Sequence, residues 1–175
     1  MTLEELKASR HKTAISRKKM SRPMRLALST RFVNPNMSLL DYGCGKGEDV
    51  TQLRSMGITA TGYDPHYHYR YSGNEKKPAD IVTLFYVLNV IEDPVERNDV
   101  LRDAYALANN VLFIAVRTGK SPLKNAEPHS DGWITSKGTF QKFFTTDELL
   151  DYVYDVLGIH AARLIDGIVY IKGER

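Results

Sequence analysis

Apolar and polar residues follow one another along the chain in a pattern that predicts strands and helices in turn. Short apolar runs rich in β-branched and aromatic residues indicate strands, and longer segments with apolar residues three or four positions apart indicate helices. The pattern predicts strands within 38–42, 58–64, 80–88 and 111–116, and helices within 48–56, 93–108 and 145–158. Because alternating strands and helices form parallel sheets with right-handed crossovers, we expect a Rossmann-like three-layer α/β sandwich.

Local signals add helix boundaries. Thr2 with Glu5, and Thr145 with Glu148, have the spacing of capping boxes, in which a hydroxyl and a carboxylate each bond the other residue's backbone. Pro23 suits the first turn of a further helix, with Met24, Leu28 and Phe32 on one face, which we expect to extend to the Asn34-Pro35 pair.

Two features stand near the end of the chain. Residues 117–138 are polar and long for a connection inside a compact domain, so we expect a loop that is a functional lid or disordered. The run "ARLIDGIVYIK" has two short strands around Asp166-Gly167, a strong hairpin signal. This hairpin adds an antiparallel strand at or near one edge of the otherwise parallel sheet.

Length and composition limit the class of protein. With 175 residues the chain is long enough for one domain with a substantial core. Cys44 is the only cysteine, which allows no intrachain disulfide and suits a reducing compartment. No signal peptide opens the chain, and the longest apolar run is too short to span a bilayer. We therefore expect a cytoplasmic protein without a membrane segment.

The net charge of +3 is unevenly distributed. Residues 1–31 hold nine Lys or Arg and two acidic residues, whereas the rest holds fifteen Lys or Arg and nineteen acidic residues. We expect a basic helical arm over 1–36 that packs on a domain over 37–175. This asymmetry favours an anionic partner such as nucleic acid, although a solvated basic surface explains the charge equally well.

The loop "DYGCGKGEDV" contains the most specific motif. It follows the first predicted strand and opens the first crossover helix, where an open parallel sheet binds its ligand. Gly43, Gly45 and Gly47 are spaced Gly-x-Gly-x-Gly, and Glu48 stands where a dinucleotide fingerprint has its third glycine. Because an acid there repels a pyrophosphate, a ligand without phosphates is favoured, and no Gly-Lys-Ser/Thr indicates a P-loop.

Two acidic residues narrow the ligand further. Asp64 closes the second strand, where a carboxylate accepts hydrogen bonds from a ribose diol, and Asp41 ends the first strand. A diol together with a cationic group describes S-adenosylmethionine (SAM), which carries an ammonium and a sulfonium. A NAD-type ligand and a purely structural turn are the less favoured alternatives.

These segments carry a family resemblance. "DYGCGKG" resembles the first motif of class I SAM-dependent methyltransferases, "GYDP" their second motif, and "LFYVLNVIEDP" their fourth-strand segment. The resemblance implies a SAM site whose residues are Asp41, Tyr42, Gly43, Cys44, Gly45, Gly47, Asp64, Pro65, Tyr86, Leu88 and Asn89.

A narrower resemblance covers most of the chain. "ISRKKMSRPMRLAL", "DYGCGKGEDV", "GYDP", "YVLNVIEDPVER" and "GTFQKFFT" together are similar to the DNA phosphorothioation-associated methyltransferase family. This implies a DNA-modification or defence setting in bacteria or phage, with protein partners from the same system. Only residues 65–79 separate the second strand from the next, so the usual helix and third strand are short or absent. Asn74 and Glu75 are positional candidates for the contact with adenine.

The methyl acceptor is less well defined. Asn89 is the candidate for a polar catalytic group near the transferred methyl, whereas Asp93 is better explained as a helix cap. The chain lacks the Asn/Asp-Pro-Pro-Tyr/Phe motif of amine-directed DNA methyltransferases and a Pro-Cys nucleophile. Cys44 is better explained as a small packing residue than as a nucleophile. A hydroxyl, a nucleic-acid end or loop, and a small metabolite remain as acceptors.

Aromatic and histidine residues after Asp64 suggest stacking rather than metal binding. His66 and His68 lack further ligands at suitable spacing, so we expect no metal. The tyrosines between 63 and 71 either flank adenine or bases, or merely cover a short crossover.

Basic and polar residues around the predicted site are candidates for substrate binding. Those assigned to the substrate are Arg17, Lys18, Lys19, Arg22, Lys137, Gln141 and Lys142. We expect the start of the basic stretch 11–28 to fold over the cofactor cleft, with the first four of these residues at its mouth. Ser16 or Arg25 is a candidate for the cofactor carboxylate, and Phe143 and Phe144 are expected in the core. The sequence therefore predicts a SAM-dependent methyltransferase acting on nucleic acid or a nucleotide-like substrate. A non-catalytic binding module and a small-molecule methyltransferase are the alternatives.

Overall fold

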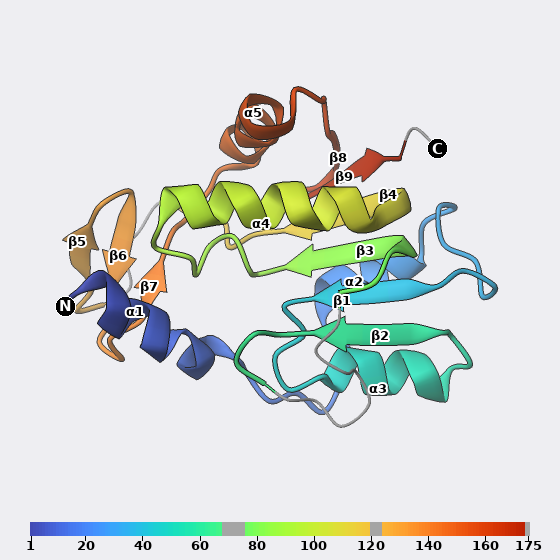
Figure 1. Ribbon diagram of the computed structural model, residues 1–175, viewed down its shortest axis with the longest axis horizontal. Helices are drawn as coiled ribbons and strands as arrows, with labels where there is room; N and C mark the ends of the chain where they lie inside the picture. Colours follow the sequence, from blue (N-terminus) through green and yellow to red (C-terminus); the bar gives the residue numbers. More distant parts are fainter. Residues whose placement is uncertain (68–75, 120–123, 174–175) are drawn as a thin grey trace.

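The computed structural model describes residues 1–67, 76–119 and 124–173 (Figure 1). Its central sheet has six strands in the order β2-β1-β3-β4-β9-β8. The first four are parallel to one another, and β9 pairs antiparallel with both β4 and β8. The strands are β1 Leu39–Tyr42, β2 Ala60–Tyr63, β3 Ala79–Phe85, β4 Ala108–Ala115, β8 Ala162–Ile165 and β9 Ile168–Lys172. The predicted Rossmann-like sandwich is confirmed, and the hairpin β8-β9 lies at one edge.

Helices cover both faces of this sheet. On one face, α2 (Arg22–Leu28) and α3 (Glu48–Ser55) bury their apolar residues, including Met24 and Leu53. On the other face, α4 (Pro94–Leu107) and α5 (Thr146–Leu157) bury Leu101 and Leu149 (Figure 1). The sheet therefore separates two hydrophobic cores.

Strand β3 shows why its sequence is almost continuously apolar. Successive side chains of a strand point to opposite faces of the sheet. Val82 and Leu84 enter the core under α4 and α5, whereas Ile81 and Phe85 enter the core under α2 and α3. A strand covered on both faces therefore needs apolar residues at odd and even positions.

The predicted caps are present, but one helix end was wrong. Thr2–Glu5 and Thr145–Glu148 form complete capping boxes. Helix α2 starts as predicted, with Ser21 accepting a hydrogen bond from Met24 N, yet it ends at Leu28 instead of near Asn34. Ser29 and Thr30 follow, and their hydroxyls donate to helix carbonyls three residues earlier. Such side-chain bonds compete with the helical backbone pattern.

The segment 117–138 is not simply a loop. Within it lie β5 (Glu127–His129) and β6 (Gly132–Ile134), which form a small antiparallel sheet with β7 (Phe140–Gln141). These strands are two or three residues long, too short for an alternation pattern to reveal. Gly132 is required because a Cβ there would lie 2.5 Å from Phe140 Cζ.

The N-terminal helix α1 (Leu3–Ser9) lies beside this small sheet (Figure 1). Ser9 Oγ donates to the carbonyl of Gly138 at 2.7 Å. The 3₁₀-helix η1 (Arg10–Thr13) follows, and the chain then crosses to α2. The start of the chain therefore contacts elements far from it in sequence.

Strand β2 is an edge strand of the sheet. The described residues between β2 and β3 form no helix or strand, and Asn74, Glu75 and His68 lie outside the described residues. No helix in the part of the chain that the structure describes is long and apolar enough to cross a bilayer.

Candidate functional site

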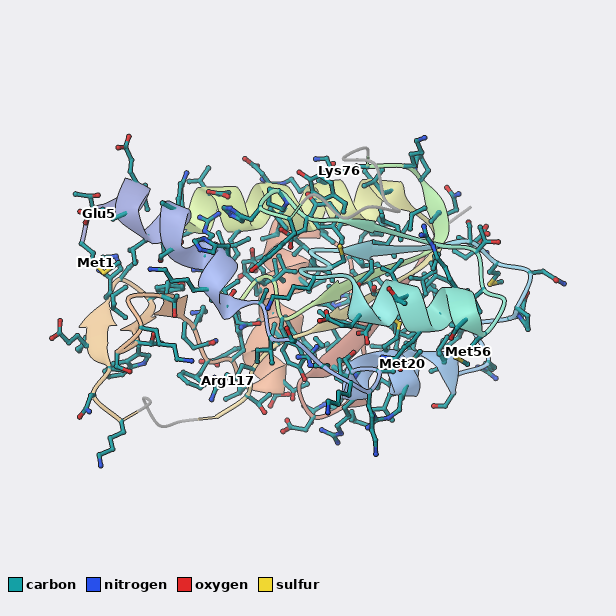
Figure 2. All side chains as sticks on the ribbon, turned by 90° about the horizontal axis from the view of Figure 1, so that it is seen from below. Met1, Glu5, Met20, Met56, Lys76 and Arg117 are labelled. Atoms are coloured by element: carbon teal, nitrogen blue, oxygen red, sulfur yellow. The ribbon has the colours of Figure 1, made fainter. Side chains whose placement is uncertain are left out.

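A cavity of about 270 Å³ lies beyond the carboxyl ends of β1, β2 and β3. The glycine loop after β1 and the residues after β2 and β3 form its floor and walls. Residues 10–17 of the N-terminal arm form its roof, and Figure 2 shows the arm running from the Met1 and Glu5 end to Met20 beside α3. Met20 N donates to Gln52 Oε1 of α3 at 2.8 Å, which fixes the far end of the arm.

The glycine loop turns through left-handed backbone conformations. Gly43 has φ of 80° and Gly45 has φ of 53°, values that L-residues with side chains rarely adopt. Gly43 also lacks room for a side chain, because a Cβ there would lie 2.3 Å from Val87 Cγ2. The loop is held by the carbonyl of Tyr63, which accepts from Gly43 N at 2.7 Å and Cys44 N at 3.1 Å.

Asp64 connects this loop to the segment after β2. Its Oδ2 accepts from Gly45 N at 2.9 Å, and its Oδ1 accepts from His66 N at 2.8 Å and Tyr67 N at 3.2 Å. A carboxylate oxygen has two lone-pair sites, so Oδ2 can accept a further bond from a hydroxyl in the cavity.

Asp41 is a buried acid that lines the cavity. Burial raises its pKa to about 7, although Thr83 Oγ1 donates a hydrogen bond to Asp41 Oδ1 at 2.7 Å, which favours the ionised form. The charges of Asp49 and Asp64 raise the pKa further, and that of Arg17 lowers it. A cationic group placed beside Asp41 would stabilise its carboxylate.

The arm is attached around the cavity at several points. Arg10 forms ion pairs with Glu92 and Glu96 at the start of α4. The hydroxyl of Tyr67 donates to the carbonyl of His11 at 2.8 Å, and Lys46 Nζ of the glycine loop donates to Ser16 Oγ at 2.8 Å. These bonds hold the roof to the start of α4, to the segment after β2 and to the glycine loop.

Tyr86, directly after β3, has a strained backbone. Its φ is 61°, which costs an L-residue about 1–2 kcal/mol. Its N–H donates to the carbonyl of Ala115 in β4 at 2.8 Å, so the sheet holds this conformation. The sharp turn brings Val87 back against Gly43, and Tyr86 itself lines the cavity.

Most of the residues predicted to hold the cofactor line this one cavity. They are Asp41, Tyr42, Gly43, Cys44, Gly45, Asp64, Pro65 and Tyr86. Gly47, Leu88 and Asn89 are not among the lining residues. Gly47 instead caps α3 with φ of 77°, and Leu88 is part of the core under α4 and α5.

Asn89 is buried away from the cavity. Its backbone carbonyl accepts from Lys142 N at 2.8 Å and from Gln141 Nε2 at 3.2 Å. Its side-chain Oδ1 is buried with no hydrogen-bond partner. Asp93 caps α4 by accepting from Val95 N at 3.0 Å, as the helix pattern predicts.

The residues assigned to the substrate divide into two groups. Arg17 lines the cavity, whereas Lys18, Lys19 and Arg22, which follow it along the arm, are exposed and are not among the lining residues. Lys137, Gln141 and Lys142 do not line the cavity. Gln141 is buried against backbone carbonyls, and Lys142 Nζ lies 3.1 Å from Asp131, so both are engaged within the protein.

Other candidates also have partners elsewhere. Arg25 Nη1 donates to the carbonyl of Met20 at 2.7 Å. Burial raises the pKa of the Cys44 thiol, which argues against a thiolate nucleophile. Phe144 is in the core, whereas Phe143 is partly exposed with the Arg117 guanidinium 5.3 Å from its ring centroid.

Among the described residues no group of three or more His, Cys, Asp or Glu could hold a metal ion.

The start of the basic stretch is expected to fold over the cofactor cleft, and residues of this stretch do line the cavity. The sequence does not single out Arg10, Thr13, Ala14 and Ile15, which line it ahead of Arg17. Glu92 and Glu96 are acids one helical turn apart, which is a signal for a basic partner. Nothing in the sequence identifies that partner as Arg10, 82 residues away.

Comparison with known proteins agrees with this architecture. A family model described as "Methyltransferase domain" matches residues 13–153. No curated protein matches the chain. The structure resembles 1,6-didemethyltoxoflavin-N1-methyltransferase from Burkholderia thailandensis, crystallised with S-adenosylhomocysteine (SAH), with TM-score 0.62 and 15% identity over 88% of this chain and 78% of that one.

Two further solved structures share the fold. The sugar N-methyltransferase from Streptoalloteichus has TM-score 0.62 and 13% identity over 90% of this chain and 89% of that one. Magnesium protoporphyrin IX methyltransferase from Synechocystis, with bound SAM, has TM-score 0.55 and 14% identity over 98% of this chain and 83% of that one. At these identities the likeness concerns the fold, while the family match covers most of the sequence: the chain belongs to the methyltransferase domain family.

Proposed function

We propose that this SAM-dependent methyltransferase acts on nucleic acid or a nucleotide-like substrate. The observation that carries the proposal is a group of exposed cations, Lys18, Lys19 and Arg22, next to the cavity-lining Arg17. Within the described parts of the chain these three side chains form no ion pair. Unpaired cations beside a reaction cavity suit a substrate that carries phosphates.

The residues of the cavity fit SAM. Asp64 has hydrogen-bonding capacity left for a ribose diol, and the left-handed glycines let the backbone approach a ligand closely. Asp41 is a buried acid that a cationic ammonium or sulfonium would stabilise. When bound, SAM supplies an electrophilic methyl group on a sulfonium.

The chain's own part in the reaction is alignment and exclusion of water. Methyl transfer is an in-line displacement, so a fixed geometry and a dry site contribute most of the acceleration. The arm over the cavity, held by Arg10, supplies the exclusion. Glu96 also lines the cavity, but its pKa is lowered to about 2 by hydrogen bonds from Arg10 and Lys7 despite partial burial. It is therefore a poor general base at neutral pH.

We also propose a bacterial or phage DNA-modification or defence setting, with protein partners from that system. The support is the narrow resemblance of five segments, which includes the arm as well as the glycine loop. The resemblance therefore covers the segment predicted to bind the substrate as well as the segment predicted to bind the cofactor.

Incubation with methyl-labelled SAM and fractionated DNA, tRNA, rRNA and metabolites tests the acceptor class. We expect label in a nucleic-acid pool, and a Lys18→Ala/Lys19→Ala/Arg22→Ala variant that transfers less. The plot of log affinity for duplex DNA against log salt concentration has a negative slope. This slope should become shallower by about three in the variant, if each cation contacts one phosphate. Label in the metabolite pool alone, with an unchanged slope, would contradict the proposal.

A small-molecule acceptor is the second candidate, and one observation favours it. The arm covers a cavity of only about 270 Å³. An acceptor that must enter under a roof is more easily a free metabolite than a residue of a long polymer. Transfer that is insensitive to salt and to the triple variant would support this candidate.

A further inference from the structure

The side wall of the cavity at the end of β3 has a pair of planar groups facing each other. The guanidinium carbon of Arg17 lies 6.0 Å from the centroid of the Tyr86 ring. Both residues line the cavity, one from the arm and the other from the sheet. An arginine over an aromatic face is a favourable pair, but both groups also stack well on a third planar ring.

Tyr86 is held in place in an unusual way. Its φ of 61° is an outlier for a bulky residue, and strain of this kind concentrates where a side chain must be aimed for function. The hydrogen bond from Tyr86 N to Ala115 O fixes the backbone against the sheet. The backbone from which the ring projects is therefore fixed.

Arg17 is the adjustable wall. It is exposed, and it belongs to the stretch between η1 and α2 that has no regular structure. A planar ring between two planar groups needs about 7 Å, because each contact takes about 3.5 Å. The present separation falls short by roughly 1 Å. A small movement of Arg17 would open the gap.

The sheet order separates this pair from the ribose end of the cofactor site. Asp64 follows β2, and Tyr86 follows β3, with β1 and its Asp41 between them. A diol held by Asp64 therefore lies on the opposite side of the glycine loop from Tyr86. The space beside Tyr86 is left for the molecule that receives the methyl group.

We propose that Tyr86 and Arg17 form a stacking subsite for a planar aromatic acceptor such as a nucleobase. This rests on the proposed function and gives it a chemical class: the acceptor atom belongs to, or is attached to, an aromatic ring. Arg17 contributes its charge as well as its plane, which favours bases and anionic heterocycles over aliphatic acceptors.

The test uses 2-aminopurine riboside, whose fluorescence is quenched by stacking, with the full chain and saturating SAH. We expect quenching by the wild-type protein. Tyr86→Phe should keep the affinity because the ring face is retained. Tyr86→Asn should weaken it about tenfold or more, as loss of a stacking partner does. Asn suits this comparison because it tolerates positive φ, so the backbone keeps its shape without the ring.

Arg17→Ala is the second arm of the test and should also weaken riboside binding, by severalfold. SAH affinity, measured by calorimetry, should fall less than riboside affinity in Tyr86→Asn and Arg17→Ala. A larger fall in SAH affinity than in riboside affinity for Tyr86→Asn would make Tyr86 a cofactor residue, as the family resemblance implies, and would overturn the subsite. Wild-type protein that does not quench, or Tyr86→Asn that binds as tightly as wild type, would overturn the subsite. Weaker SAH binding by Arg17→Ala with unchanged riboside binding would make Arg17 a cofactor residue instead.

Failure of the subsite and failure of the proposed function give different results. If the acceptor is a nucleic acid but is not stacked here, the Lys18→Ala/Lys19→Ala/Arg22→Ala variant loses binding to a fluorescein-labelled single-stranded oligonucleotide, while Tyr86→Asn does not. If the subsite is present but the substrate is a small heterocycle, the triple variant binds the riboside normally and no variant affects the oligonucleotide.

Discussion

Arg10 binds both carboxylate oxygens of Glu92, with Nε 2.9 Å from Oε2 and Nη2 2.7 Å from Oε1. The Glu92 side chain is fully buried, and that of Arg10 is 11% exposed. Arg10 also pairs with Glu96, to which Lys7 Nζ comes within 2.9 Å. This cluster joins the N-terminal arm to the start of α4, and so it closes the roof over the cavity.

Arg10→Ala should destabilise the fold and open the cavity. Removing one partner of a buried ion pair leaves the other charge uncompensated, which costs about 3–5 kcal/mol. We expect a loss of about 3 kcal/mol in urea unfolding and SAH binding at least tenfold weaker by calorimetry, since the roof is no longer held.

Lys7→Ala is the matched control, because Lys7 pairs with Glu96 from a more exposed position. Exposed ion pairs contribute little, so this variant should behave like the wild type in both measurements. If Arg10→Ala binds SAH as tightly as Lys7→Ala does, the arm is not a roof that the cofactor depends on.

The same cluster predicts a loss of stability in acid. The pKa of Glu96 is lowered from 4.5 to about 2, mainly by the hydrogen bond from Arg10. A carboxyl whose pKa is lower in the folded state stabilises the protein above its unfolded pKa, and this contribution disappears as pH falls. The free energy of unfolding should therefore drop between about pH 5 and pH 2 more steeply in wild type than in Glu96→Gln. Parallel curves for the two proteins would contradict the assignment.

For Asp41 we expect the opposite dependence of the free energy of unfolding on pH. Burial raises its pKa to about 7, so the folded protein holds a proton there that the unfolded chain releases above about pH 4. Stability should fall as pH rises from about 4 to 7 because of this group, and Asp41→Asn should remove that dependence.

Cofactor binding responds to the same group. The ammonium and sulfonium of SAM favour the ionised carboxylate, so SAM affinity should rise as pH increases through about 7, with release of a proton. Calorimetry at pH 6.5 in two buffers of different ionisation enthalpy measures that proton. Asp41→Asn should show none, and proton release that persists in this variant would assign the effect to another residue.

Much of this architecture was predictable because the signals are local. Continuous apolar runs identify strands buried on both faces, capping boxes begin helices, and glycines mark the turn after β1. The contact that holds the roof was not predictable, because Arg10 and Glu92 meet only after the sheet and α4 have formed. Tyr86 illustrates the same limit, since no residue preference predicts positive φ for tyrosine. The short strands β5 to β7 depend on mutual pairing that two or three residues cannot encode.

Gly43 provides the sharpest test of the glycine loop. Gly43→Ala places a Cβ in a backbone with φ of 80° and 2.3 Å from Val87 Cγ2. The left-handed conformation costs about 1 kcal/mol, and the clash adds about 1–3 kcal/mol through displacement of Val87. Gly57 has φ of 82° with nothing within 4 Å of its Cβ position, so Gly57→Ala carries the backbone cost alone.

Urea unfolding of the two variants therefore separates conformation from crowding. Gly43→Ala should be the less stable of the two and should lose at least tenfold in SAH affinity, while Gly57→Ala should bind SAH normally. Adding Val87→Ala to Gly43→Ala should restore part of both losses, because it removes the atom that the new Cβ meets. If the double variant recovers nothing, the close approach of Val87 to Gly43 does not determine the shape of the loop, and left-handed strain alone explains the glycine.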